Sequence, residues 1–115
     1  MEVSRGDIVL VDLDPTQGSE QGKTRPAVII QNDVGNKHAP TTILAPVTSS
    51  YDKTYPVNIE LKSNNSVLDK DSIVLLNQIR TVSIEHRIIE VIGEMPDKKM
   101  EELDVAIEIS LGLRK

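Results

Sequence analysis

Short apolar runs alternate with polar turns along the first two-thirds of the chain, which is typical of β-strands. Asp14-Pro15 closes the first run as a turn, and Pro26 stands at the start of the second, where its missing N–H is tolerated. The pattern predicts strands at residues 7–13, 26–31, 41–47, 57–61, 72–76, 78–82 and 88–92. Many short strands at this spacing predict a mainly β (α+β) fold, built as a small antiparallel barrel or sandwich.

The end of the chain has the period of an amphipathic helix. Apolar residues recur there at three- and four-residue steps, at Met100, Leu103, Ile107 and Leu111. We expect the carboxylate of Asp97 to cap the first turn and Gly112 to end the helix. A shorter helical turn is predicted at residues 83–87.

Two predicted connections, residues 14–25 and 48–56, are longer than a hairpin needs. Loops of about 12 residues inside a compact domain are uncommon and often functional, so we expect a site near these two loops. Residues 33–40 form a third connection, which contains Asn and Gly and is predicted to be a turn region.

Length and charge bound the possible functions. The 115 residues predict a single domain over residues 1–115. There are 18 acidic and 13 basic side chains, a net charge of −5, and the deficit is spread evenly, which disfavours general electrostatic coating of a nucleic acid. The only aromatic residues are Tyr51 and Tyr55, which argues against a base-stacking platform of the usual kind. With no long apolar run, we expect no membrane partner and a cytoplasmic location.

Several kinds of chemistry are disfavoured by residue type. The chain has no cysteine, so thiolate zinc sites and thiol nucleophiles are excluded. His38 and His86 are isolated, and no His or carboxylate pair has the spacing of metal ligands, so we expect neither a metal nor a cofactor. Residues 18–24 lack the glycine spacing and the following helix of a phosphate-binding Walker loop.

Polar residues at the ends of the predicted strands remain as candidates. Arg25 precedes a proline, which restrains its backbone to an extended conformation, and Gly18 and Gly22 allow backbone amides to converge on an anion. Thr48 ends a strand and opens the second long loop. A guanidinium, a hydroxyl and backbone amides can bind a phosphodiester and stabilise its dianionic transition state.

The same residues also have plainer interpretations. Arg25 alone is compatible with a surface ion pair and Thr48 with a turn cap. Gln78 and Arg80 are predicted on one face of a strand, opposite the inward-facing Ile79, and suit the solvent face of a half-buried strand. The residue types alone leave both interpretations open.

Taken in order, these segments resemble the MazF/PemK family of bacterial toxin endoribonucleases, and the resemblance covers essentially the whole chain. The segments that carry it are Arg5-Gly6-Asp7, Asp14-Pro15-Thr16, Gly18-Ser19-Glu20-Gln21-Gly22, Arg25-Pro26-Ala27-Val28-Ile29, Pro46-Val47-Thr48, Asp71-Ser72-Ile73-Val74, Gln78-Ile79-Arg80-Thr81 and Ser110-Leu111-Gly112. The chain departs from the family's pattern where several relatives have an aromatic in the first strand, near Leu10 or Leu13 here, and at Asn77, where many have an acidic residue.

The resemblance implies a small SH3-like antiparallel barrel with a C-terminal helix, assembled as a homodimer. It implies sequence-specific cleavage of single-stranded mRNA without a metal, in which the 2′-hydroxyl attacks and leaves 2′,3′-cyclic phosphate and 5′-hydroxyl ends. An ACA- or UAC-centred recognition motif is suggested by resemblance alone. The expected partners are single-stranded RNA and a MazE-like antitoxin that blocks the RNA groove.

By the same resemblance, the catalytic residues are Arg25 and Thr48. The implied RNA-binding residues are Ser19, Glu20, Gln21, Gly22, Thr24, Ser49, Asn77, Gln78 and Arg80. The general base stays open, because a guanidinium with a pKa above about 12 deprotonates poorly.

Two other functions compete with this one. A CcdB-like toxin of related fold poisons gyrase through a C-terminal tail that contains Trp, and this chain has no Trp. A non-enzymatic SH3-like binding module would give Arg25 no special role.

Overall fold

The computed structural model describes residues 1–65 and 67–114. The predicted domain over residues 1–115 also includes residues 66 and 115, which lie outside the described part. The strands are β1 (Asp7–Asp12), β2 (Thr24–Ile29), β3 (Thr41–Thr48), β4 (Asn58–Leu61), β5 (Ser72–Leu75), β6 (Arg80–Ser83) and β7 (Ile88–Glu94). The helices are α1 (Asp33–His38), α2 (Ile84–Arg87) and α3 (Asp97–Ser110), with a short 3₁₀ turn, η1 (Ser63–Asn65).

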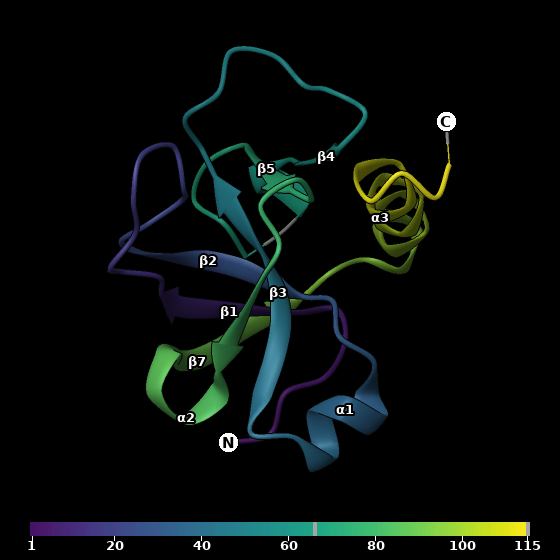
Figure 1. Cartoon of the computed structure of the whole chain (residues 1–115). Helices are drawn as coiled ribbons and strands as arrows, with labels where there is room; N and C mark the ends of the chain where they lie inside the picture. The colour runs from purple at the N-terminus through teal and green to yellow at the C-terminus, as the bar shows by residue number, and fades with distance from the viewer. Residues whose placement is uncertain (66, 115) are drawn as a thin grey trace.

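All paired strands are antiparallel and form a bent sheet in the order β4-β5-β3-β2-β1-β7, with β6 paired to β3. The long β3 strand joins the two halves, because it pairs with β2 and β6 in one half and with β5 in the other (Figure 1). Between β6 and β7 no pairing occurs within the described residues, so the barrel is open. The prediction of a small antiparallel barrel with a C-terminal helix is confirmed in this open form.

The two faces of β1 and β2 pack into two separate cores. Ile8 and Val28 face a core shared with β3, β4, β5 and α3. Val9 and Ala27 are the sequence neighbours of Ile8 and Val28, so their side chains point to the opposite face of the sheet. There they pack into a second core with Leu44 and residues of α2 and the N-terminal segment. Because both faces are covered, β1 and β2 are a rigid base for the loop that connects them.

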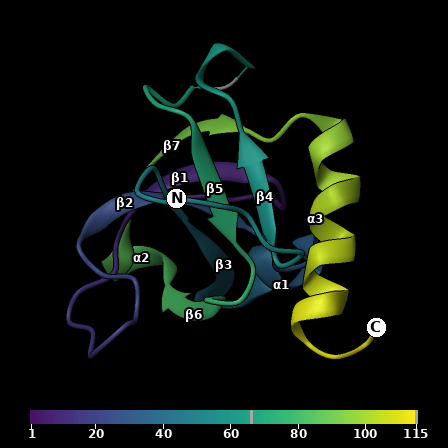
Figure 2. The same cartoon turned by 90° about the horizontal axis from the view of Figure 1, so that it is seen from above.

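Helix α3 runs beside β4 and closes the first core with Leu103 and Ala106 (Figure 2). The prediction that Asp97 caps this helix is wrong: Pro96 is the N-cap, and no side chain caps the first turn. Asp97 is itself helical, one residue too far along to act as the cap. Gly112 follows the helix with a φ of +76°, as a C-terminal glycine should.

The turn region predicted at residues 33–40 contains helix α1, which the sequence analysis missed. Gly35 within it lowers helix propensity, but Asn32 caps the helix by accepting a 2.8 Å hydrogen bond from the Gly35 amide. Thr42 also donates to the Asn36 side chain over 2.7 Å. Tertiary hydrogen bonds and a cap therefore outweigh a weak propensity. The helical turn predicted near residues 83–87 is confirmed as α2, capped by Ser83.

Candidate active site

Arg25 and Thr48 come together where the β2–β3 ladder ends. The last pair of that ladder is Ala27 with Pro46, and Arg25 and Thr48 each lie two residues further on, on the same face of their strands. Pro26 and Pro46 have no N–H to donate, so two prolines stand where the ladder stops and the strands separate. Arg25 and Thr48 line one pocket of about 430 Å³ that opens at this point.

The Arg25 guanidinium is held by the loop that precedes it. Its Nε donates to the Gly22 carbonyl over 2.7 Å, and one terminal nitrogen donates to the Gln21 side-chain oxygen. Two acceptors on two sides fix the plane of the group, and its remaining N–H donors can meet an anion in the pocket. Lys70 adds a second cation to this pocket and Asp69 one carboxylate, so the local balance is positive although the chain is acidic.

Two arginines hold the start of the loop between β1 and β2 (residues 13–23), called here the catalytic loop because it binds the predicted catalytic residue Arg25. Arg80 donates to the Leu13 carbonyl over 2.9 Å. Arg87 donates to the Asp12 carbonyl over 3.3 Å and to the Asp14 carbonyl. Three successive carbonyls are therefore bound by side chains that lie more than 60 residues away in the sequence. Arg80 is not among the residues that line the pockets beside Thr48, so its contact with RNA stays a prediction.

The catalytic loop is also closely packed within itself. A Cβ on Gly22 would lie 2.5 Å from the Thr16 hydroxyl and 2.6 Å from an Asp14 carboxylate oxygen, so a larger residue fits there only if these two side chains move. The same Asp14 oxygen accepts the Lys23 amide over 2.8 Å, and Lys23 has a φ of +63°. The loop thus depends on a close backbone approach at Gly22.

Gln78 joins this loop to the far side of the site. Its Nε2 donates to the Ser19 carbonyl over 3.1 Å, and its Oε1 accepts the Gln21 amide over 3.2 Å. The prediction that Gln78 is part of a strand is wrong, because β6 begins only at Arg80. Gln78 lies in the turn after β5, and from there it reaches the loop.

A second pocket, of about 340 Å³, adjoins the first, and Thr48 and Ser50 line both. Its other lining residues include Gln21 of the catalytic loop and Asn58 at the start of β4. The rest come from the loop between β3 and β4, called here the tyrosine loop (residues 49–57), from strand β5, and from the turn that holds Asn77 and Gln78. The two pockets form one groove that passes over Thr48. In Figure 1 the catalytic loop lies at the left of this region and the tyrosine loop above it.

The other predicted RNA-binding residues are placed differently. Ser49 lines the Arg25 pocket and Asn77 the second pocket. Glu20 accepts the Gln17 amide over 2.8 Å within the catalytic loop. Thr24 is exposed and one residue from Arg25 on the strand, so its side chain points to the opposite face.

Part of the groove lining was not predicted from the sequence. The missed side chains are Tyr51, Asp52, Lys53, Tyr55 and Asn58 in one pocket and Asp69 and Lys70 in the other. Two signals were present: the length of the loop at residues 48–56, and the placement of both aromatic residues of the chain within it.

The Thr48 hydroxyl is positioned to donate a hydrogen bond. Its oxygen accepts the Ser50 amide over 3.1 Å, so its proton is available for a ligand. Beside the groove, removal from water and then the Glu60 carboxylate raise the pKa of Tyr51, which keeps this phenol protonated. No group of His, Asp and Glu side chains suited to hold a metal occurs among residues 1–65 and 67–114.

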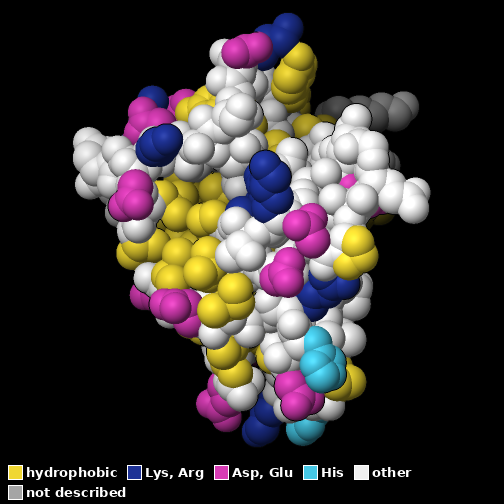
Figure 3. All heavy atoms as spheres, turned by 90° about the vertical axis from the view of Figure 1, so that its left-hand side faces the viewer, with side chains coloured by type: hydrophobic (Ala, Val, Ile, Leu, Met, Phe, Trp, Pro, Cys, Tyr) yellow, Lys and Arg dark blue, Asp and Glu magenta, His cyan; other side chains and the backbone are white. Residues whose placement is uncertain are grey.

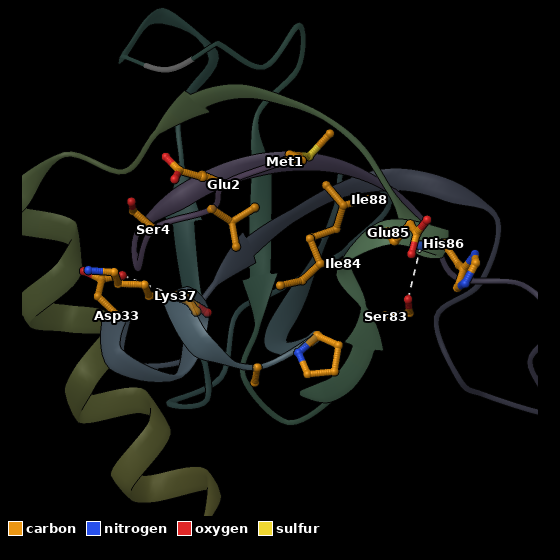
Figure 4. A pocket seen from close by; sticks show the side chains of 14 residues that line it. Met1, Glu2, Ser4, Asp33, Lys37, Ser83, Ile84, Glu85, His86 and Ile88 are labelled. Atoms are coloured by element: carbon orange, nitrogen blue, oxygen red, sulfur yellow. Dashed lines mark hydrogen bonds between the residues drawn. The ribbon is translucent and has the colours of Figure 1, made fainter.

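A larger pocket of about 990 Å³ lies elsewhere, between the N-terminal segment, α1 and α2 (Figure 4). Glu2, Asp33 and Glu85 line it against Lys37, so its charge does not favour a phosphate. His86 also lines it, and its backbone amide donates to the Ser83 hydroxyl over 3.1 Å, a bond that caps α2. None of the predicted site residues lies there.

The face that holds the catalytic loop has mixed charge. Figure 3 shows Lys and Arg side chains interspersed with Asp and Glu around a hydrophobic area, without a broad basic surface. This agrees with the even charge distribution in the sequence. None of the helices in the described part of the chain has the length and apolar character needed to cross a membrane.

Known proteins match this chain over nearly its full length. A curated relative from Staphylococcus saprophyticus, named endoribonuclease MazF, is 52% identical over 110 residues, which are 95% of this chain and 91% of the relative. Among solved structures, MazF of Deinococcus radiodurans is 25% identical with a TM-score of 0.81, covering 97% of this chain and 98% of that one. A MazE–MazF structure from the same organism gives 25% identity and a TM-score of 0.76, with 99% of both chains covered.

The family model described as PemK-like, MazF-like toxin of type II toxin–antitoxin system matches residues 4–111. This match spans almost the whole chain, and the fold and the order of the motifs agree with it. The resemblance predicted from the sequence is therefore confirmed. The chain belongs to the family of PemK-like, MazF-like toxins of type II toxin–antitoxin systems.

Proposed function

We propose that this toxin cleaves single-stranded mRNA at the phosphate bound between Arg25 and Thr48. The prediction that the chain is an endoribonuclease is confirmed by its family and by the relative of 52% identity. The observation that carries the assignment of the site is the shared pocket of Arg25 and Thr48 at the end of the β2–β3 ladder.

The proposed reaction needs no nucleophile from the protein. The RNA 2′-oxygen attacks the adjacent phosphorus, the bond from phosphorus to the 5′-oxygen breaks, and the products are a 2′,3′-cyclic phosphate and a 5′-hydroxyl. One proton leaves the 2′-hydroxyl to a base, and one reaches the departing 5′-oxygen. The protein's share is to hold the phosphate in line and to stabilise the charge that develops on it.

The two proposed catalytic residues have distinct roles. The Arg25 guanidinium, fixed by Gly22 and Gln21, would stabilise the phosphorane and donate toward the departing oxygen. The Thr48 hydroxyl would donate to a non-bridging oxygen. The 2′-hydroxyl supplies the nucleophile, which explains why the pocket needs no histidine or cysteine.

The partners follow from the family. An antitoxin of MazE type is the proposed inhibitor, because structures similar to this chain include MazE–MazF complexes. We further propose that the chain forms a homodimer and acts in the cytoplasm, where mRNA is available. The two competing functions, a gyrase poison and a non-enzymatic binding module, have no observation in their favour.

The test is cleavage of a long single-stranded RNA in excess EDTA. Wild-type protein should produce discrete fragments with 2′,3′-cyclic phosphate ends, and Arg25→Ala and Thr48→Ala should each slow cleavage by roughly 100-fold or more, the cost of removing one charge-stabilising group. Matched controls are Arg114→Ala, whose arginine pairs with Glu108 at the far end of α3, and Thr81→Ala on the exposed side of β6. Intact RNA with wild-type protein, or full activity of both groove variants, would contradict the proposal.

A further inference from the structure

The pocket beside Thr48 combines features that suit a planar aromatic ligand. Both aromatic residues of the chain, Tyr51 and Tyr55, line it from one loop, in which three residues separate them. Ile73 and Leu75 of β5, both nearly buried, line it as well and supply an apolar surface. Its volume of about 340 Å³ falls in the range of roughly 300–1,000 Å³ typical of small-ligand sites.

Tyr55 is unusually exposed for a large ring. Its exposed fraction is 56%, in a chain where most large apolar side chains are covered. The Lys53 ammonium lies 5.3 Å from the centre of its ring, so a positive charge stands beside the aromatic face. An exposed aromatic ring next to a cation is the combination with which proteins bind the bases and phosphates of single-stranded nucleic acids.

One hydrogen bond links Tyr51 to strand β4. Its hydroxyl donates to a Glu60 carboxylate oxygen over 3.3 Å, and Glu60 pairs with Lys62 at 3.4 Å. Glu60 lies on β4, in register with Ile73 of β5, which pairs in turn with Thr48. The Tyr51 hydroxyl therefore bonds to a residue that lies in the same cross-strand row as Thr48.

The pocket also has amides that could recognise the edge of a base. Asn58 uses its side-chain oxygen to accept the Tyr55 amide over 2.9 Å, which leaves its amide nitrogen to donate. The exposed Asn77 lines the same pocket. Gln78 is less suited to this task, because both ends of its side-chain amide are bonded to the catalytic loop.

From these contacts we propose that the pocket between the tyrosine loop and β5 binds a nucleobase next to the scissile phosphate, stacked on Tyr55 and read by Asn58 and Asn77. The inference rests on the proposed function, because it takes RNA as the ligand. Thr48 and Ser50 line this pocket and the Arg25 pocket alike. A phosphate held at Arg25 and Thr48 would therefore place a neighbouring nucleotide at the tyrosines.

The test compares Tyr55→Leu and Tyr55→Phe, with Leu113→Ala as the control for an exposed apolar side chain far from the groove. The first readout is equilibrium affinity for an RNA whose cleavage-site ribose is 2′-O-methylated, so that it binds but cannot react. Tyr55→Leu should weaken this affinity by roughly 5- to 150-fold, the range found for loss of base stacking on an aromatic side chain. Tyr55→Phe, which keeps the ring, should bind within about twofold of wild type.

The second readout locates the base. Abasic nucleotides are placed one at a time along the same RNA, and affinity is measured for wild type and for Tyr55→Leu. At one position, the abasic nucleotide should weaken the affinity of wild type by about the same factor as Tyr55→Leu does with the intact RNA. At that position it should hardly change the affinity of Tyr55→Leu. Equal losses in both proteins at every position would overturn the inference, as would unchanged affinity of Tyr55→Leu or a loss confined to binding of an antitoxin.

The two proposals can fail separately. Binding does not require cleavage, so a base site at Tyr55 would still be detected if the wild-type protein cut no RNA in EDTA. Conversely, normal cleavage that depends on Arg25 together with unchanged affinity of Tyr55→Leu would leave the proposed function standing and remove the base site.

Discussion

The two loops that border the groove are built in different ways. The catalytic loop is bound at its start by Arg80 and Arg87, at its far side by Gln78, and internally around Gly22. The side-chain hydrogen bonds of the tyrosine loop are few, join residues close in sequence and lie near the surface. The difference suggests a division of work: the first loop fixes the group that stabilises charge, and the second offers surfaces that receive a base.

Among substitutions that test the two loops, the largest effect should come from filling the space at Gly22. A methyl group there would meet Thr16 and Asp14 at 2.5 and 2.6 Å, and the displaced Asp14 would lose the Lys23 amide. The Gly22 carbonyl holds Arg25, so we expect Gly22→Ala to lower kcat by about 100-fold, as misplacement by about 1 Å can do.

Gly18→Asn is the control for Gly22→Ala in the same loop. A Cβ at Gly18 meets no atom within 4 Å, and asparagine tolerates its φ of +56°. Steady-state kinetics on a short RNA should show Gly18→Asn near wild type. Similar activity of the two variants would mean that the loop's packing does not position Arg25.

Arg87 tests the attachment of the catalytic loop without touching the groove. Arg87→Met removes the donors to the Asp12 and Asp14 carbonyls while keeping an unbranched side chain. We expect kcat to fall by about 10-fold with little change in KM, and amide hydrogen exchange in residues 13–23 to accelerate. Arg87→Lys should restore part of the lost kcat and part of the protection from amide hydrogen exchange. An unchanged exchange rate with a reduced kcat would show that Arg87 acts by another route.

Tyr51→Phe should have a small effect, within about threefold in KM. The substitution removes a single 3.3 Å hydrogen bond to the partly exposed Glu60 and keeps the ring that lines the pocket. The same kinetic assay measures it. A loss of 10-fold or more would mean that the Tyr51 hydroxyl itself contacts RNA and that the tyrosine loop is more tightly built than its bonds indicate.

The smallest effect concerns stability and pH. The Ser63 amide lowers the pKa of Asp71, and the Arg5 amide lowers the pKa of Asp33. A carboxyl with a lower pKa in the folded state stabilises the fold above its unfolded pKa of about 3.9, and this stabilisation is lost as the pH falls through the folded pKa. Unfolding in urea between pH 6 and pH 2 should therefore show a slightly flatter decline for Asp71→Asn than for wild type. A steeper decline in stability for Asp71→Asn than for wild type would contradict the lowered pKa of Asp71.

The strand pattern and the C-terminal helix could be predicted because both are fixed by local alternation of apolar and polar residues. Helix α1 could not, because it depends on bonds from Asn32 and Thr42 that outweigh its glycine. Arg25 and Thr48 were found by residue type and resemblance. The roles of Arg80 and Gln78 in binding the catalytic loop depend on contacts across more than 50 residues, which no local pattern records.

The division of work between the two loops is the central claim, and one kinetic comparison tests it directly. Cleavage of one short RNA by Arg87→Met and by Tyr55→Leu is measured over a full range of substrate concentration. We expect Arg87→Met to lower kcat with KM nearly unchanged, and Tyr55→Leu to raise KM with kcat nearly unchanged. If both variants change the same parameter by similar factors, the two loops do not divide positioning from recognition.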